Sequence, residues 1–434
     1  MASFFHLPFE MLIAIAELLC TEDEEKNHYP SLFHLIQVDH YVYHSLQEYY
    51  LRAVYERVTL SSVSPVWTKL MTYPHHQKYI VQVQLNARDD ISAECLACLS
   101  SLDNLRRVSL NVTSSRFCGL TEVLQSLHGR KLVQIEMNLD HLARKLTEEE
   151  RTALRHLLTP SIKSVRYSEW KDRSELIRAE MGCFDMFSNL CQLLSDCSSL
   201  EELSIGKVFD DYSYELGDQF PHLKKIKMDN GCVLSHFMRP LSDGRMRPIH
   251  KLRVHWYSEP RDIPFSSLET LRHVNLGWCV RSVPMILHDP PPRLSSLRCR
   301  LTDISSVHQF DRLMRNDTLH RLDLLLDNPP PIHNRSRSSI ETTAIDLRAG
   351  LMLHTEWMHL CAHLGHVSMT WEVEDEGEGN LEDRSSVTYN IRFNMSEKKM
   401  TYETHHQKRA RRIVEVFWGL KIQDPHVPPA ILIL

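Results

Sequence analysis

A short apolar motif recurs along most of the chain, and this repetition restricts the possible folds more than any other feature. The motif has the form apolar-x-x-apolar-x-apolar and first appears as YERVTL, from Tyr55. Most consecutive starts lie between 22 residues (Ile249 to Leu271) and 30 residues (Leu132 to Ile162) apart, which is the spacing of a repeat protein whose units stack. The other motifs begin at Ile80, Leu105, Leu200, Leu223, Leu294, Leu319 and Leu364.

Each repeat predicts one strand and one connecting helix. The end of each motif alternates apolar and polar residues, as a short strand with one buried face does, whereas segments such as 92–102, 116–129 and 184–197 have a helical period. Parallel strands joined by helices cannot bury their apolar faces singly. The predicted fold is therefore α/β: an irregular solenoid over residues 53–370, a horseshoe of parallel strands and helices.

The motif fades after residue 370, and residues 371–434 are predicted to form a C-terminal cap and tail. An acidic loop from residue 372 comes first. A hairpin is expected from 386–394 and 398–404, followed by a helix over 407–420. The apolar tail 428–434 is expected to pack back, because a solenoid must cover its last apolar face.

Composition excludes several classes of protein. Hydrophobic residues make up 42% of the 434 residues and charged residues 24%, and no stretch approaches the ~20 apolar residues of a membrane helix. The net charge of -6 gives no global attraction to nucleic acid or anionic lipid. The 11 cysteines are odd in number and lie mainly among apolar neighbours, as reduced cysteines do. We therefore expect a cytoplasmic or nuclear protein without cofactor or metal.

The first fifty residues predict two or three short helices. Pro8 and Glu10 suit a first helical turn, and a second helix restarts at Pro30. A secretion signal is not expected, because no Lys or Arg precedes the apolar run and glutamates interrupt it. A helical domain of residues 1–52 is too small to be stable alone, so it should pack on the repeats, on a partner, or on both.

These residues also carry a family resemblance. The pattern Leu7-Pro8-x-Glu10-x-Leu12-x-x-Ile15-x-x-x-Leu19, followed by LFHLIQVDHYVYHSL and YLRAVYERVTL, resembles the F-box of fungal F-box proteins with a leucine-rich or irregular repeat region. In that family the F-box binds the Skp-type adaptor of a cullin-based ubiquitin ligase, and the repeats recruit the substrate. The resemblance implies adaptor contacts at Leu7, Pro8, Glu10, Leu12, Ile15, Leu32, Leu35 and Val38.

The resemblance implies a non-catalytic function. The chain would be a substrate-recognition subunit of a Skp-cullin-F-box ubiquitin ligase, holding a target protein near a ubiquitin-loaded enzyme and so raising its effective concentration. A second interpretation keeps the solenoid but makes the chain an interaction scaffold with a degenerate F-box, outside any ligase.

Motifs for catalysis or metal binding are weak in this sequence. Phosphate-binding loops and nucleophile elbows do not occur. Cys95 and Cys98 form a lone pair without a second pair at zinc spacing, and His359 and His363 lack the glutamate of a zinc protease. Both pairs are expected to be structural, and the chain is not expected to be an enzyme. The basic run 408–412 is compatible with a nuclear address or with the solvated face of a helix.

The later repeats predict a basic groove. If the apolar residues of each motif point inward, the residues beside them line the opposite face of the sheet. In the earlier repeats these are mostly neutral, such as Gln82, Gln84 and Gln134. The groove would take an acidic or phosphorylated segment of a target protein; the alternative is an ordinary solvated strand face. Its candidate residues are Lys225, Lys227, Lys251, Arg253, His255, Arg298, Arg300 and Arg321.

Overall fold

The structure is a computed structural model, and its described residues form two compact units, Met1–Gly206 and Lys207–Leu434. Each unit is considered by itself. Within the described residues no helix combines the length and the apolar character needed to cross a bilayer. The described residues are 7–23, 30–61, 66–88, 91–114, 117–139, 146–169, 186–206, 215–230, 234–256, 265–278, 283–301, 311–326, 364, 366–375, 385–394, 399–406, 412–417 and 431–433.

Three helices begin the first unit, as the sequence predicts: α1 (Phe9–Asp23), α2 (Pro30–Ile36) and α3 (His40–Glu56). The Pro8 carbonyl accepts hydrogen bonds from the Met11 and Leu12 N–H groups at the start of α1, and the Asp39 carboxylate caps α3 by accepting from the Tyr41 N–H at 2.7 Å. The helices enclose a core of their own, so residues 9–56 form a helical domain. Since α3 runs straight into the first strand, no linker separates this domain from the repeats at residue 52. The core contains Leu12, Ala16, Leu32, Leu35, Ile36, Val42 and Leu46.

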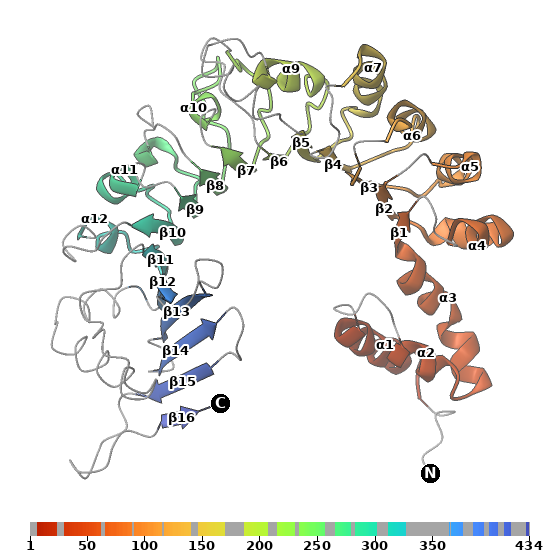
Figure 1. The fold of residues 1–434 in the computed structure, drawn as a ribbon, viewed down its shortest axis with the longest axis horizontal. Coiled ribbons are helices and arrows are strands. Elements are labelled where there is room, and N and C mark those ends of the chain that lie inside the picture. Colours follow the sequence, from red (N-terminus) through yellow and green to blue (C-terminus); the bar gives the residue numbers. More distant parts are fainter. Residues whose placement is uncertain are drawn as a thin grey trace. The chain divides into compact units, whose positions relative to one another are not determined.

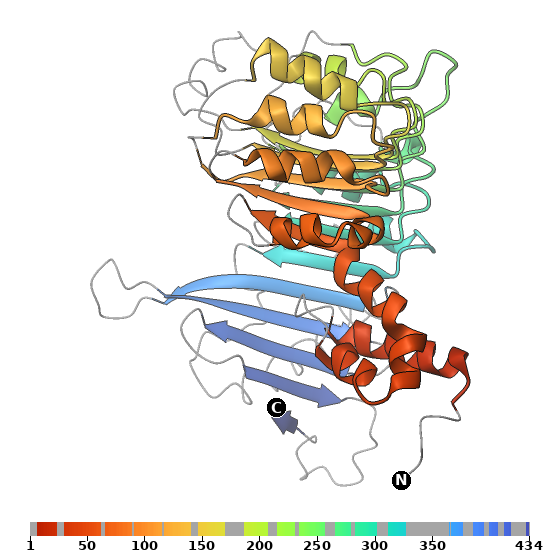
Figure 2. The same ribbon diagram turned by 90° about the vertical axis from the view of Figure 1, so that its right-hand side faces the viewer.

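The rest of the first unit is an open parallel sheet with helices on one face (Figures 1 and 2). The apolar positions of successive motifs stack in register, as with Val58, Val83 and Val108, and their side chains are buried. Each motif thus supplies one strand, which confirms the predicted parallel α/β repeat. The strands are β1 (Arg57–Ser61), β2 (Gln82–Ala87), β3 (Arg107–Val112), β4 (Gln134–Leu139), β5 (Ser164–Glu169) and β6 (Glu202–Ile205). The helices are α4 (Val66–Thr72), η3 (Pro74–Tyr79), α5 (Ala93–Ser101), α6 (Leu120–Ser126), α7 (Glu148–Leu157) and α9 (Met186–Leu193).

The second unit continues the same construction (Figure 1). Its short helices cover one face of a parallel sheet, and the other face carries the outward residues of the motifs. The strands are β7 (Lys225–Asn230), β8 (Lys251–Trp256), β9 (His273–Trp278), β10 (Ser296–Leu301), β11 (Arg321–Leu326) and β12 (His366–Asp375). The helices are α10 (Leu234–Phe237), η4 (Phe265–Ser267), α11 (Val283–His288) and α12 (Asp311–Met314).

After β12 the chain becomes antiparallel. The expected hairpin is present as β13 (Ser385–Asn394) and β14 (Lys399–His406). The helix predicted over 407–420 is wrong, because β15 (Arg412–Phe417) pairs with β14: its β-branched residues favour a strand where a sheet edge is available. The tail does pack back, through β16 (Ile431–Ile433) on β15. Residues 372–375 of the expected acidic loop belong to β12, and the rest of that stretch lies outside the described residues.

Candidate functional surfaces

Two rows of polar side chains cross the sheet of the second unit on the face opposite the helices. The parallel register fixes these rows, because Lys225 pairs with Lys251, and Lys227 pairs with Arg253. We call both rows, together with Arg300 at the next outward position of β10, the strand face. The first row is Lys225, Lys251, His273, Ser296, Arg321 and His366. The second is Lys227, Arg253, Asn275, Arg298, Asp323 and Ser368.

The strand face is cationic over β7, β8 and β10. Lys251, Arg253 and Arg298 are exposed, and none of the three forms an ion pair with a carboxylate in the described part of the chain. Lys225, Lys227 and Arg300 are half-buried. The side chain of His255, which lies in β8, is outside the described residues. The structure therefore brings the sequence-predicted basic residues of these strands together on one face.

Two histidines beside these lysines have lowered pKa values. Burial lowers the pKa of His273 first, and the charge of Lys251 lowers it further. The pKa of His250, which directly precedes β8, is also lowered, first by burial and then by the charge of Lys225. Burial is the larger cause of both shifts; the smaller contributions of Lys251 and Lys225 arise because a neighbouring cation disfavours the protonated imidazole.

The positive charge is neutralised at β11. The Arg321 Nε donates to the Asp323 carboxylate at 2.8 Å, and the Ser368 hydroxyl donates to the same carboxylate at 2.9 Å. His366 Nε2 lies 3.8 Å from it. Sequence reasoning placed Arg321 among the groove cations, but its guanidinium is held by a carboxylate of its own strand. Spacing could have revealed this pair, since Arg321 and Asp323 are two residues apart in one strand.

The corresponding face of the first unit is mostly uncharged, although Arg57 and Arg107 are exposed in its first row on either side of Gln82. The Asn111 side-chain amide donates to Asn86 at 3.2 Å, and the Ser168 hydroxyl donates to Asn138 at 3.2 Å. The Arg166 guanidinium in β5 is paired with Glu136 in β4 at 2.6 Å. These polar groups satisfy one another across the strands, so the larger group of neighbouring cations is on the second unit.

The second candidate surface is apolar and lies on the helical domain. Within the described residues, nine large hydrophobic side chains are exposed, and seven of them belong to residues 9–43. Met11, Ala14 and Leu18 share one face of α1, because they are spaced three and four residues apart. Leu18 is 69% exposed. We call the seven residues the helical patch: Phe9, Met11, Leu18, Phe33, Val38, Tyr41 and Tyr43.

Burial divides the residues that the family resemblance assigns to adaptor binding. Leu12, Leu32 and Leu35 are buried in the core of the helical domain, so they hold the three helices together and do not face a partner. Leu7 and Ile15 pack partly against the same core. Pro8, Glu10 and Val38 are exposed and border or belong to the helical patch. The helical wheel of α1 could have separated Leu12 from Met11 and Leu18.

The other residues considered for chemistry have structural surroundings or lie outside the described residues. Cys95 and Cys98 are buried on α5, and burial raises the pKa of the two thiols to about 12 and about 11. His359, His363 and residues 408–411 lie outside the described residues. Among the residues that are described, no group of three or more His, Cys, Asp or Glu could hold a metal ion.

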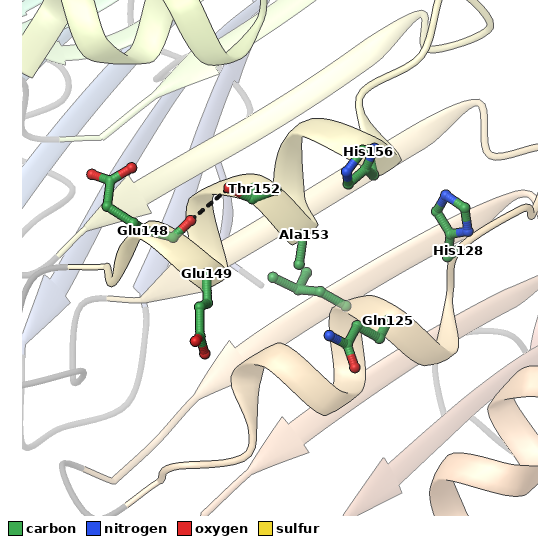
Figure 3. A pocket seen from close by; sticks show the side chains of 8 residues that line it. Gln125, His128, Glu148, Glu149, Thr152, Ala153 and His156 are labelled. Carbon is green, nitrogen blue, oxygen red and sulfur yellow. Dashed lines mark hydrogen bonds between the residues drawn. The ribbon is translucent and has the colours of Figure 1, made fainter.

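A groove of about 620 Å³ lies between α6 and α7 on the helical side of the first unit (Figure 3). His128 and His156 stand at one end, with their ring centroids 5.7 Å apart, and Glu148 and Glu149 line the other end. Leu124, Gln125, Thr152 and Ala153 complete the lining. Sequence reasoning did not single out these residues, since they come from two separate repeats.

Comparisons with known proteins add no assignment. Neither the family models that were searched nor the curated proteins contain a match to this chain. The two surfaces and the resemblance carried by the N-terminal residues are therefore the features that bear on function.

Proposed function

We propose that this chain is a substrate-recognition subunit of a Skp-cullin-F-box ubiquitin ligase, acting in the cytoplasm or nucleus. The helical domain would bind the Skp-type adaptor, and the repeats would bind a target protein. The chain itself would perform no chemistry. It would raise the effective concentration of the target near the ubiquitin-loaded enzyme.

The helical patch is the observation that carries this proposal. Apolar side chains exposed singly are ordinary, but Met11 and Leu18 lie together on one face of α1 and are both at least half exposed, and adjoining exposed apolar side chains are typical of a protein-binding surface. The patch lies on the segment that resembles the F-box. The core beneath it is complete without those side chains, so they are available to a partner.

Binding to the adaptor tests the proposal directly. The chain and a fungal Skp-type adaptor are co-expressed, and the adaptor is captured through an affinity tag. We expect the wild-type chain to co-purify with the adaptor and the double variant Met11→Glu/Leu18→Glu not to co-purify. In the variant, two charges would be buried against an apolar partner surface without compensation. Both side chains are exposed, so the helical domain should keep its fold, which circular dichroism can check.

Met71→Glu is the matched control. Met71 is also exposed, at 46%, but it lies on α4 outside the helical domain, so adaptor capture should be unchanged. A Leu12→Asp variant would not distinguish binding from folding, because that side chain is fully buried. If wild type fails to capture the adaptor, the ligase proposal falls and the interaction scaffold replaces it.

A further inference from the structure

We infer that the strand face of the second unit binds an extended peptide carrying two anionic groups, one at each of two cationic subsites. The inference rests on the proposed function in one respect only, that the peptide belongs to the recruited target. The first subsite, the β7–β8 cluster, consists of Lys225, Lys227, Lys251 and Arg253. The second, the β10 pair, consists of Arg298 and Arg300.

The neutral strand β9 separates the two subsites. It presents His273 and Asn275 between them, in register with both neighbouring strands. Neighbouring strands are about 4.8 Å apart, so the β10 pair lies about 10–12 Å from the β7–β8 cluster. An extended peptide advances about 3.3 Å per residue, so two anionic groups about three residues apart would reach both subsites.

The end of the surface is also defined. Asp323 lies in register with Arg298 and holds Arg321 and Ser368, so β11 adds no uncompensated positive charge beside the β10 pair. A ligand that continued over β11 would meet an ion pair whose charges already compensate each other. The favourable footprint is therefore limited to β7 through β10, which suits a short segment with two charges better than a long polyanion.

A peptide fits this surface better than a single-stranded nucleic acid. Proteins that bind single strands combine cations with aromatic rings on which bases stack. The outward positions of β7 to β10 that the structure describes carry Lys, Arg, His, Asn and Ser but no Phe, Tyr or Trp. Arg253 and Arg298 instead offer planar guanidinium groups, which pair with carboxylate or phosphate through two hydrogen bonds.

Fluorescence anisotropy with the purified full chain tests the inference without any adaptor. The probes are fluorescein-labelled peptides of one composition with two phosphoserines three residues apart, with the two phosphoserines adjacent, or with one phosphoserine. We expect the spaced peptide to bind about tenfold or more tightly than the others, because its second contact is intramolecular. A spaced peptide with glutamates in place of both phosphoserines distinguishes a constitutively acidic target from a phosphorylated one.

Charge reversal identifies the subsites. Arg253→Glu and Arg298→Glu should each reduce the affinity for the spaced peptide to that for the single phosphopeptide. Arg239→Glu is the matched control and should have no effect, because Arg239 is exposed in the same unit but follows α10, outside the strand rows.

Three results would overturn the inference. These are affinity independent of the spacing, an unchanged affinity in Arg298→Glu, and equal binding of a single-stranded RNA of the same charge. None of these results would contradict the proposed binding of the adaptor, since Met11 and Leu18 lie in the first unit. Conversely, loss of adaptor capture in Met11→Glu/Leu18→Glu should leave peptide binding intact.

Discussion

Arg247 is the largest fully buried side chain in the described part of the chain. Its guanidinium donates to backbone carbonyls in two segments of the second unit: those of Gly217 and Gln219 before β7, and those of Phe237 and Arg239 at and just after the end of α10. Loop carbonyls buried without a partner are costly, so this one side chain replaces the water that would otherwise solvate them. Arg247, although arginine is usually exposed to water, thus joins two consecutive repeats from the inside.

Arg247→Met should therefore destabilise the chain although it makes the position more hydrophobic. It removes the donors and leaves buried carbonyls without them, at a cost of about 3 kcal/mol in the free energy of unfolding. Urea denaturation followed by circular dichroism measures the change. Arg245→Met is the control, because Arg245 is exposed and should shift the midpoint little. Equal midpoints for Arg247→Met and wild type would show that the carbonyls find other partners.

At the scale of the element, the start of α7 has a complete capping box. The Glu150 N–H donates to the Thr147 hydroxyl at 3.2 Å, and the Thr147 N–H donates to the Glu150 carboxylate at 2.8 Å. Glu150 is almost fully buried, so this pair also satisfies a buried carboxylate. Sequence predicts the repeat around it from the apolar spacing, whereas the burial of a glutamate depends on how neighbouring repeats pack.

Thr147→Ala should destabilise the first unit by about 1 kcal/mol, because an N-terminal N–H of α7 loses its acceptor. Thr147→Ser keeps the hydroxyl and should be close to wild type. Thermal denaturation of the two variants side by side provides the measurement. A Ser variant as unstable as the Ala variant would assign the effect to the lost methyl group and contradict the role of the cap.

At the scale of the whole molecule, acid should weaken the fold through histidines beside cations. Burial lowers the pKa of His250, His273 and His366, and the positive charges of Lys225, Lys251 and Arg321 respectively lower it further. In the unfolded chain these histidines titrate near pH 6.5, so just below that pH the unfolded chain binds protons that the folded chain does not. The free energy of unfolding should therefore be highest above about pH 6.5 and fall as the pH decreases below it.

Urea midpoints at about pH 7 and about pH 5.5, at constant ionic strength, check this dependence. The carboxylates with lowered pKa values, such as Asp218 and Asp243, titrate below this window and do not contribute to it. A variant with glutamine at positions 250, 273 and 366 should lose part of the slope. A slope that is unchanged in this variant would place the titrating groups elsewhere.

Much of the fold could be predicted from the sequence, since a strand of period two and a repeat of about 25 residues both depend on local spacing. The outward cations of β7, β8 and β10 follow from the same spacing. Pairing across space could not be predicted in this way. Asp323 engages both Arg321 and Ser368, and the latter lies 45 residues further along the chain. Likewise the sequence around Leu12 is compatible with a partner contact and with a core position. The packing of α2 and α3 against α1 is what buries its side chain.

The reversal of strand direction after β12 bears on how such a chain can evolve. Duplicating a segment of the parallel array adds one more strand and helix that continue the existing register, so the polar face of the sheet can lengthen by internal duplication. A copy inserted after β13 would meet a neighbour running the opposite way and would have no matching edge. Changes in the length of this face are therefore expected to arise from gains and losses of repeats upstream of this boundary, while the antiparallel strands after β12 stay together as a block.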